Sequence, residues 1–149
     1  MSKCVLVSIK PQWCNLIANR RKMYEVRKSR PNIEPPFKVY VYCTKSGNET
    51  YLIWDEKKRQ FREAKGTVIG EFICDEIITF DKFKTGETYT IAERVKLADG
   101  SAMNFSDIRE YADGKTIYLW HISSYKPYKE AIYLVGKPPQ SWRYIEEEK

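Results

Sequence analysis

The sequence predicts a single domain of the α+β class, mostly β, built as a small barrel of five or six strands with two or more short helices. Three observations support this fold. The chain has 149 residues, enough for one domain with one core. Short apolar stretches with the two-residue alternation of strands recur along its length, and helical spacing occurs in only two short stretches. Proline, glycine and asparagine separate these elements.

The N-terminal residues predict a strand followed by a helix. Residues 4–9 form an apolar stretch that ends before Pro11. Pro11 suits the first turn of a helix, because a residue at that position needs no N–H for an intrahelical hydrogen bond. Apolar residues at helical spacing follow it, and the helix should end near residues 19–21.

Residues 23–28 predict a second, short strand. Its alternation places Tyr24 and Val26 on one face and Glu25 and Arg27 on the other. The two charged side chains are therefore expected close together on a common face.

The rest of the chain predicts further strands, one insertion and one more helix. Gly70 lies inside an apolar run and indicates a bulge. Residues 45–65 predict a surface insertion folded as a hairpin or loop, and residues 104–111 predict a helix with an Asn or Ser cap. The Asp99-Gly100 pair indicates a turn, and the tail from about residue 124 is expected to be irregular. The expected strands are residues 39–43, 67–78, 88–96 and 115–122.

Several function classes lack support in the sequence. No apolar run approaches the roughly 18 residues needed to cross a bilayer, and no signal peptide is recognised, so we expect a soluble, cytoplasmic protein without a membrane partner. The four cysteines, at positions 4, 14, 43 and 74, form no CxxC pair and have no neighbouring histidine. They predict buried thiols, with no metal site. No phosphate-binding loop or dinucleotide fingerprint occurs, and no cofactor is expected.

Positive charge is concentrated at the start of the chain. The formal net charge is +6. Residues 1–30 contain eight basic residues and one acidic residue, whereas the other 119 contain 18 basic and 19 acidic residues. Such a segment suits a polyanion, most simply a nucleic acid, because each neutralised phosphate releases bound counterions. A solvated charged turn is the alternative interpretation.

Two short motifs stand near the start of the chain, SIKPQW at 8–13 and KMYEVR at 22–27, and three more follow, YADGK at 111–115, WHIS at 120–123 and PQSW at 139–142. In the first two the chain resembles the ASCH domain family, relatives of the PUA domains, and in the later three it resembles a phage and bacterial branch of that family. The family typically shows a strand, a helix that opens with proline and an aromatic residue, and then a GxKxxExR signature. Here Arg20 occupies the glycine position, while Lys22, Glu25 and Arg27 match.

The resemblance implies a PUA-like β-barrel with a cleft beside the signature that takes RNA or a nucleotide. Some members of the family are small hydrolases that remove the acetyl group of N4-acetylcytidine, and others are ribonucleases. In the amidohydrolases a threonine stands three residues after the signature lysine. Glu25 occupies that position here, so catalysis through a hydroxyl nucleophile is unsupported.

The signature residues allow more than one role. Arg27 and Glu25 could read complementary edges of one base, Arg27 could hold a phosphate, or the two could form an ion pair within the protein. Lys22 could contact a phosphate, which we prefer, or act as a general base if burial lowers its pKa. In a hydrolase, Glu25 would activate water and Lys22 would stabilise the oxyanion, with Glu71 as the best second carboxylate.

Aromatic residues and the single histidine complete the candidate site. Trp13 and Trp120 are the preferred platforms for base stacking. His121, as a lone histidine in an apolar strand, is expected to be a hydrogen-bonded core or rim residue, although the resemblance places its segment at the cleft.

The leading hypothesis is a barrel that binds RNA or a modified nucleotide in a basic cleft. A small hydrolase using Lys22 and Glu25, or a protein-interaction and regulatory module, are the alternatives. The predicted site comprises Trp13, Arg20, Arg21, Lys22, Glu25, Arg27, Lys28, Trp120 and His121, with Arg30 as a further contact to the nucleic-acid backbone.

Overall fold

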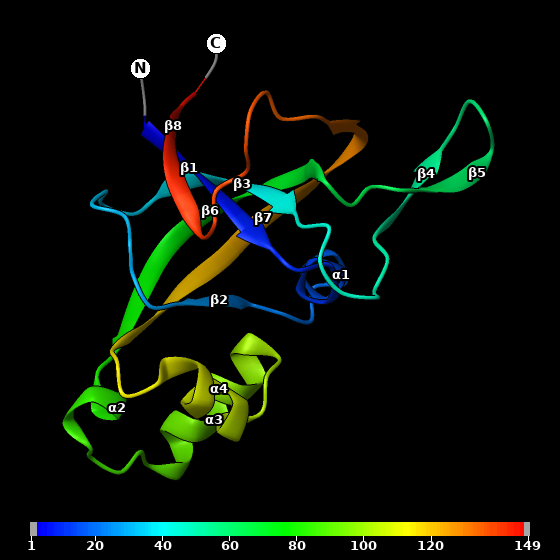
Figure 1. Cartoon of the computed structure of the whole chain (residues 1–149). Coiled ribbons are helices and arrows are strands. Elements are labelled where there is room, and N and C mark those ends of the chain that lie inside the picture. Colours follow the sequence, from blue (N-terminus) through cyan, green and yellow to red (C-terminus); the bar gives the residue numbers. More distant parts are fainter. Residues whose placement is uncertain (1–2, 148–149) are drawn as a thin grey trace.

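The computed structural model describes residues 3–147, which form eight strands and four helices (Figure 1). The strands are β1 (Lys3–Ile9), β2 (Tyr24–Arg27), β3 (Phe37–Cys43), β4 (Leu52–Asp55), β5 (Gln60–Glu63), β6 (Thr67–Phe80), β7 (Ile117–Ile132) and β8 (Trp142–Glu146). The helices are α1 (Pro11–Ala18), α2 (Lys82–Thr85), α3 (Ile91–Ser101) and α4 (Phe105–Ala112).

Six strands form one sheet in the order β2-β7-β6-β3-β1-β8. Strand β1 runs parallel to β3, and the other neighbouring pairs are antiparallel. The long strands β6 and β7 run along the length of the sheet, and register shifts between them bend it (Figure 1). Because β2 and β8 are its two edges, the sheet is barrel-like without being closed. The expected mixed, mostly β fold is confirmed, and the open, curved sheet is consistent with a PUA-like barrel.

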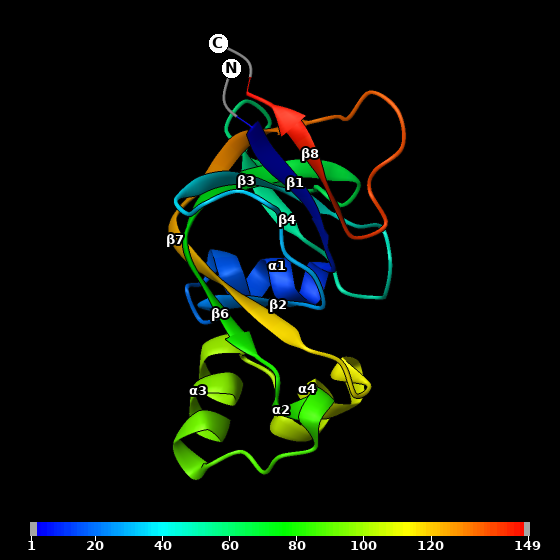
Figure 2. The same cartoon turned by 90° about the vertical axis from the view of Figure 1, so that its left-hand side faces the viewer.

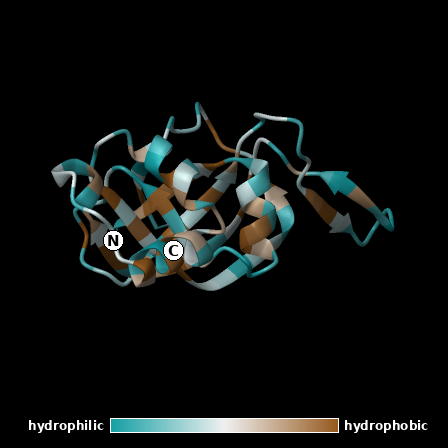
Figure 3. Cartoon of the chain, turned by 90° about the horizontal axis from the view of Figure 1, so that it is seen from below, coloured by the Kyte–Doolittle hydropathy of each residue, from teal (hydrophilic) through white to brown (hydrophobic). Residues whose placement is uncertain are grey.

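The first half of the chain folds as predicted. The expected strand, helix and strand correspond to β1, α1 and β2, and α1 begins at Pro11. Gly70 does lie at a register shift in β6, where a side chain would collide with the Tyr125 hydroxyl. Within residues 45–65, β4 and β5 form the expected hairpin, which pairs with no other strand and stands away from the body (Figures 1 and 3).

The strand expected at residues 88–96 is wrong, because helix α3 occupies this region. Thr90 caps the helix: its side chain accepts a hydrogen bond from the Glu93 amide, and the Glu93 carboxylate accepts one from the Thr90 amide. This reciprocal capping box satisfies two amides that a helix N-terminus otherwise leaves unpaired. The Asp99-Gly100 pair, expected as a turn, lies in the last turn of the helix. Helix α4 forms where it was predicted.

The irregular tail expected from residue 124 is also wrong. Strand β7 continues to Ile132, because β6 offers it a partner as far as Val68. Strand β8 then pairs antiparallel with β1, from Lys3 opposite Glu146 to Val7 opposite Trp142. The C-terminal residues therefore complete one edge of the sheet.

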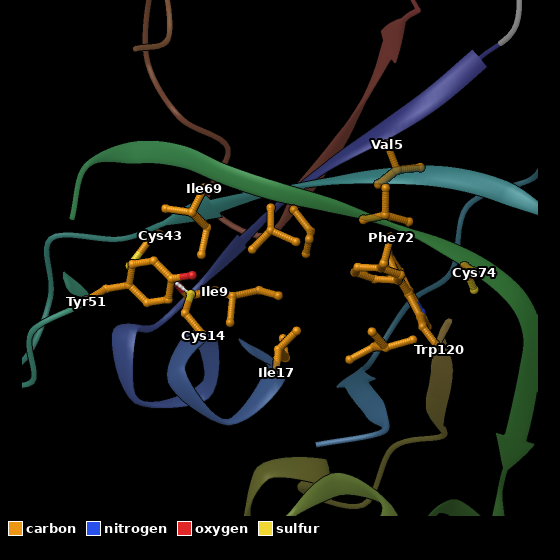
Figure 4. Close-up of a cluster of buried hydrophobic side chains, with 14 of the residues drawn as sticks. Val5, Ile9, Cys14, Ile17, Cys43, Tyr51, Ile69, Phe72, Cys74 and Trp120 are labelled. Carbon is orange, nitrogen blue, oxygen red and sulfur yellow. Dashed lines mark hydrogen bonds between the residues drawn. The ribbon is translucent and has the colours of Figure 1, made fainter. Parts of the chain in front are cut away.

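The main core lies between the curved sheet and α1. Figure 4 shows Ile9, Cys14 and Ile17 packed beneath Ile69 and Phe72 of the sheet. All four cysteines are buried, as predicted.

A second hydrophobic cluster joins the sheet to a separate layer made of α2, α3 and α4 (Figure 2). Val26 and Tyr24 of β2 contribute to it, and Leu97 of α3 is fully buried there. The Met23 amide donates to the carbonyl of Gly100 (2.8 Å). Position 100 must be glycine for this approach, because a Cβ would lie 2.6 Å from the Tyr24 ring. Across the residues that the structure describes, no helix has both the length and the apolar character to cross a membrane.

Candidate functional site

The open side of the sheet, between edge strands β2 and β8, is bridged by side chains, and we call this region the seam. Arg27 on β2 donates from Nη2 to the carbonyl oxygen of Ser8 at the end of β1 (2.6 Å) and from Nη1 to Ser141 Oγ (3.1 Å). Trp142 Nε1 donates to Ser29 Oγ (2.9 Å). The Glu25 and Arg27 face of β2 therefore looks toward the seam, whereas its other face packs on the helical layer.

Lys22 is buried at the entrance to β2, with only 2% of its surface exposed. Its Nζ donates to the carbonyl oxygen of Ser101, the last residue of α3 (2.7 Å), and lies 4.9 Å from the centroid of the Trp13 ring. The carbonyl end of a helix carries partial negative charge and favours a cation. Burial is the main effect on the pKa of Lys22 and lowers it, while the charge of Glu25 opposes this shift and that of Arg27 adds to it.

Glu25 and Arg27 lie close together without forming a hydrogen-bonded ion pair. Glu25 is 5% exposed, and its Oε1 accepts a hydrogen bond from the Val26 amide (3.1 Å). Its Oε2 lies 3.8 Å from Arg27 Nη2, beyond hydrogen-bond distance. The internal ion pair considered from the sequence is therefore only a loose contact, because the Arg27 fork is directed to Ser8 and Ser141.

Three buried polar atoms at the seam have no hydrogen-bond partner among residues 3–147: Glu25 Oε2, Arg27 Nε and Trp120 Nε1. Glu25 and Trp120 stand opposite each other on β2 and β7, so their side chains share a face of the sheet. Unpaired buried groups are uncommon in folded proteins and often mark functional positions. The closed seam thus encloses one acceptor and two donors that are unpaired among the described residues, with the Lys22 ammonium nearby.

The two tryptophans predicted as stacking platforms differ in exposure. Trp120 is fully buried and packs against the rings of Phe37 and Trp142, with centroids 6.3 and 5.9 Å away. The stacking prediction for Trp120 is wrong, because a fully buried indole has no face available to a base. Trp13 is half-buried and has the Lys22 ammonium against its ring, and its stacking role stays a prediction.

His121 lies at the rim of the sheet, opposite Tyr24 in the β2–β7 pairing. Its Nδ1 is 2.6 Å from Asp75 Oδ1, and its ring centroid is 5.0 Å from that of Tyr24. This is the hydrogen-bonded rim position expected of the lone histidine. Its participation in a binding site stays a prediction.

The basic residues that follow α1 differ in their exposure to solvent. Arg20, Arg21 and Lys28 are exposed and Arg30 is half-buried, whereas Lys22 is enclosed. Lys22 and Glu25 are too deeply buried to form the walls of an open basic cleft. The exposed cations instead flank the buried pair on the surface.

Tyr111 of α4 links the seam to a surface hollow of about 430 Å³. Burial raises the pKa of the Tyr111 phenol, on which the charges of Arg27 and Glu25 also act. Lys28 Nζ lies 4.7 Å from the centroid of the Tyr111 ring. This hollow is mixed in charge, because Lys28 and Tyr111 share it with Asp107, Glu110 and Asp113.

Sequence reasoning missed four residues that shape the site: Ser8, Ser101, Tyr111 and Ser141. Ser8, Tyr111 and Ser141 all lie in motifs that carried the family resemblance, and this was the available signal. Ser101 had no such signal.

Glu71, considered as a second carboxylate, takes part in a different cluster. Its Oε2 lies 3.3 Å from Lys38 Nζ, and its Oε1 accepts from the Tyr128 hydroxyl (2.9 Å).

Within residues 3–147, no group of three or more His, Cys, Asp or Glu side chains is placed to hold a metal ion.

Comparison with known proteins identifies the fold. No family model matches the sequence, and no curated protein sequence matches it. The structure resembles the crystal structure of an ASCH protein from Zymomonas mobilis, with a TM-score of 0.68 and 16% sequence identity, over 96% of this chain and 87% of that chain. Two substituted forms of the same protein each match with a TM-score of 0.65 and 16% identity over 96% of this chain, covering 90% and 88% of theirs. This chain therefore has the fold of ASCH domain structures, as its motifs indicated.

Proposed function

We propose that this protein binds RNA or a modified nucleotide at the seam, which opens so that the ligand reaches the buried Lys22 and Glu25 together with Arg27. The observation that carries the proposal is the presence of the unpaired Glu25 acceptor and the unpaired Arg27 donor on one face of β2, beside the buried Lys22 ammonium. A nucleobase edge presents donors and acceptors in one plane, which complements such a pair.

The cations around the buried signature residues support the same ligand. Arg20 and Arg21 follow α1, and Lys28 and Arg30 follow β2, so four cations flank the buried signature residues. Single strands, loops or ends are the favoured targets, because their bases are free to leave the stack and reach protein groups.

Affinity for single-stranded RNA is expected to fall with salt, at a slope of about −3 in log affinity against log salt if four phosphates are contacted. Replacing Arg20 and Arg21 with glutamine should reduce the steepness by about 1.4, since each phosphate contact contributes about 0.7. Fluorescence titration at several salt concentrations measures both slopes. The control is Lys84→Gln with Lys96→Gln, which makes the same charge change on α2 and α3.

The same titration separates the proposed function from the protein-interaction alternative. RNA, DNA and an acidic peptide are compared at low and physiological salt. RNA affinity that is indifferent to salt, or preference for the acidic peptide, would contradict the proposal.

The burial of a lysine and a carboxylate at the same strand, Lys22 just before β2 and Glu25 within it, favours a second candidate function, hydrolysis of a nucleoside amide or of RNA. For an amide, Glu25 would take a proton from water, the hydroxide would attack the carbonyl carbon, and the Lys22 ammonium would stabilise the oxyanion. The proton on Glu25 would then pass to the departing amine. The resemblance to amidohydrolases and ribonucleases suggests acetylcytidine-type nucleosides and RNA as the substrates to test.

The pH profile of turnover would identify the role of Lys22. If Lys22 acts as an ammonium, turnover should fall as the pH rises through the pKa of Lys22. Burial places this pKa below the ordinary lysine value of about 10.4. As a general base, Lys22 should give turnover that rises through the same range. Lys22→Met and Lys22→Ala should both abolish turnover. No turnover of either substrate by the unmodified protein would reject this second function.

A further inference from the structure

The β4–β5 hairpin carries large aromatic side chains that are left in water. Trp54 is 41% exposed and Phe61 is 63% exposed. The two residues stand opposite each other on the hairpin, with ring centroids 5.1 Å apart in an edge-to-face arrangement. A two-stranded hairpin alone is only marginally stable in water, and grouped apolar side chains on a surface commonly mark a binding region.

A hollow of about 750 Å³ lies between this hairpin and the end of β7. Its aromatic walls come from both sides, with Trp54 on the hairpin and Tyr128 and Tyr133 on the segment at the end of β7. Tyr133 is 75% exposed. The basic side chains of Lys57, Arg62 and Lys129 line it together with Asp55, Glu56 and Glu130.

The basic side chains of the hairpin and two of its acidic side chains differ in the contacts that they make. Lys57, Lys58 and Arg62 make no ion pair within 4.0 Å in the part of the chain that the structure describes. Asp55, in contrast, accepts hydrogen bonds from the amides of Lys57 and Lys58, which fixes the turn. Glu63 accepts from two backbone amides in the same way. Positive charge at the tip thus remains available to a ligand.

We infer that the hairpin surface, defined by Trp54, Lys57, Lys58, Phe61 and Arg62, is a second contact for single-stranded RNA. Aromatic faces beside unpaired cations are the combination that binds single strands, since bases stack on the rings and phosphates approach the cations. This inference rests on the proposed function, because it extends the ligand of the seam.

Helix α1 connects the two surfaces. The Asn15 side chain, in the middle of α1, donates to the Thr50 carbonyl just before the hairpin (2.8 Å), and the C-terminal end of the helix leads toward Arg20, Arg21 and β2. Figure 1 shows α1 between β2 and the hairpin. The helix has eight residues and is about 12 Å long. A single strand that contacts both surfaces would therefore run along α1.

Length dependence of binding tests the inference. Affinities of the full chain are measured for single-stranded RNAs of about 4 to about 16 nucleotides, the range covered by known single-strand grooves. Trp54→Leu, which keeps apolar bulk without a ring, should weaken the longest RNA by about 5- to 100-fold and leave the shortest unchanged. Trp54→Phe should retain most of the affinity for the long RNA.

A charge variant gives an independent readout. Changing Lys57, Lys58 and Arg62 to glutamine should reduce the steepness of the salt slope for long RNA by about 2. The matched control removes three exposed lysines far from the hairpin in sequence, Lys84 of α2, Lys96 of α3 and Lys115 after α4, and should leave the slope unchanged.

The outcomes separate this inference from the proposed function. Hairpin variants that bind every RNA as the unmodified protein does, or that weaken all lengths equally, would overturn the hairpin contact and leave the seam proposal intact. Failure of the unmodified protein to bind any RNA would remove both.

Discussion

Replacing Lys22 with alanine is expected to lower the free energy of unfolding by about 3 kcal/mol. The substitution removes the donor to the Ser101 carbonyl, which is enclosed at the end of α3, and leaves the buried Glu25 carboxylate without its nearby ammonium. Urea unfolding followed by tryptophan fluorescence measures the loss. The neighbouring Arg21 is exposed, so Arg21→Ala should change stability by less than about 0.5 kcal/mol. Equal effects of the two variants would contradict the buried position of Lys22.

The pH dependence of this stability has a defined sign. Because burial lowers the pKa of Lys22 in the folded protein, the unfolded chain holds the proton more tightly between that pKa and about 10.4. Stability relative to the non-titrating variant Lys22→Met should therefore rise with pH across this window and stay constant below it. Groups that titrate in both proteins cancel in the difference. A difference that stays flat up to pH 10.4 would show that the lysine pKa is not lowered by folding.

The local sequence pattern was sufficient to predict the structure of the segment that carries the site. Alternation in residues 23–28 predicted that Glu25 and Arg27 share a face opposite Val26, and the structure confirms it. Strand geometry itself imposes this alternation, so it does not depend on distant partners. The helix that opens at Pro11 was also predictable, because proline fits only the first turn.

Two errors in the fold have different physical origins. The segment before and within α3 contains Thr, Tyr, Ile and Val, which favour strands, and this composition concealed the capping signal of Thr90 and Glu93. Strand β8 gives no comparable local signal. It is stabilised by pairing with β1, far away in the sequence, and such pairing cannot be read from a short window.

The burial of the signature lysine could not be predicted for the same reason. Lys22 is held by the Ser101 carbonyl, 79 residues away along the chain. Trp120 was predicted as a stacking platform because the sequence shows that the residue is aromatic but does not show whether it is exposed. The structure places it in the core. The motifs located the region correctly, while the depth of each side chain depended on tertiary contacts.

Arg27→Lys is expected to weaken binding of a nucleotide or short RNA by about 10- to 100-fold, although the charge is unchanged. The guanidinium bridges the Ser8 carbonyl and Ser141 Oγ at once, and its Nε remains unpaired among the described residues. A lysine ammonium is a single point and cannot reproduce this planar set of donors. Competition titration with mononucleotides and short RNAs measures the loss.

Arg30 supplies the matched control for that experiment. It belongs to the same basic segment, and its contacts to the carbonyls of Pro31 and Ile33 are long, at 3.4 and 3.5 Å. Arg30→Lys should therefore change affinity by no more than about twofold. If Arg27→Lys lowers the unfolding free energy and leaves nucleotide affinity unchanged, Arg27 serves only to hold the seam together. Loss of affinity for Arg27→Lys, with little change for Arg30→Lys, would instead indicate that the ligand contacts the Arg27 guanidinium. Both substitutions keep the charge, and the two variants differ only in the contacts that the lost guanidinium made.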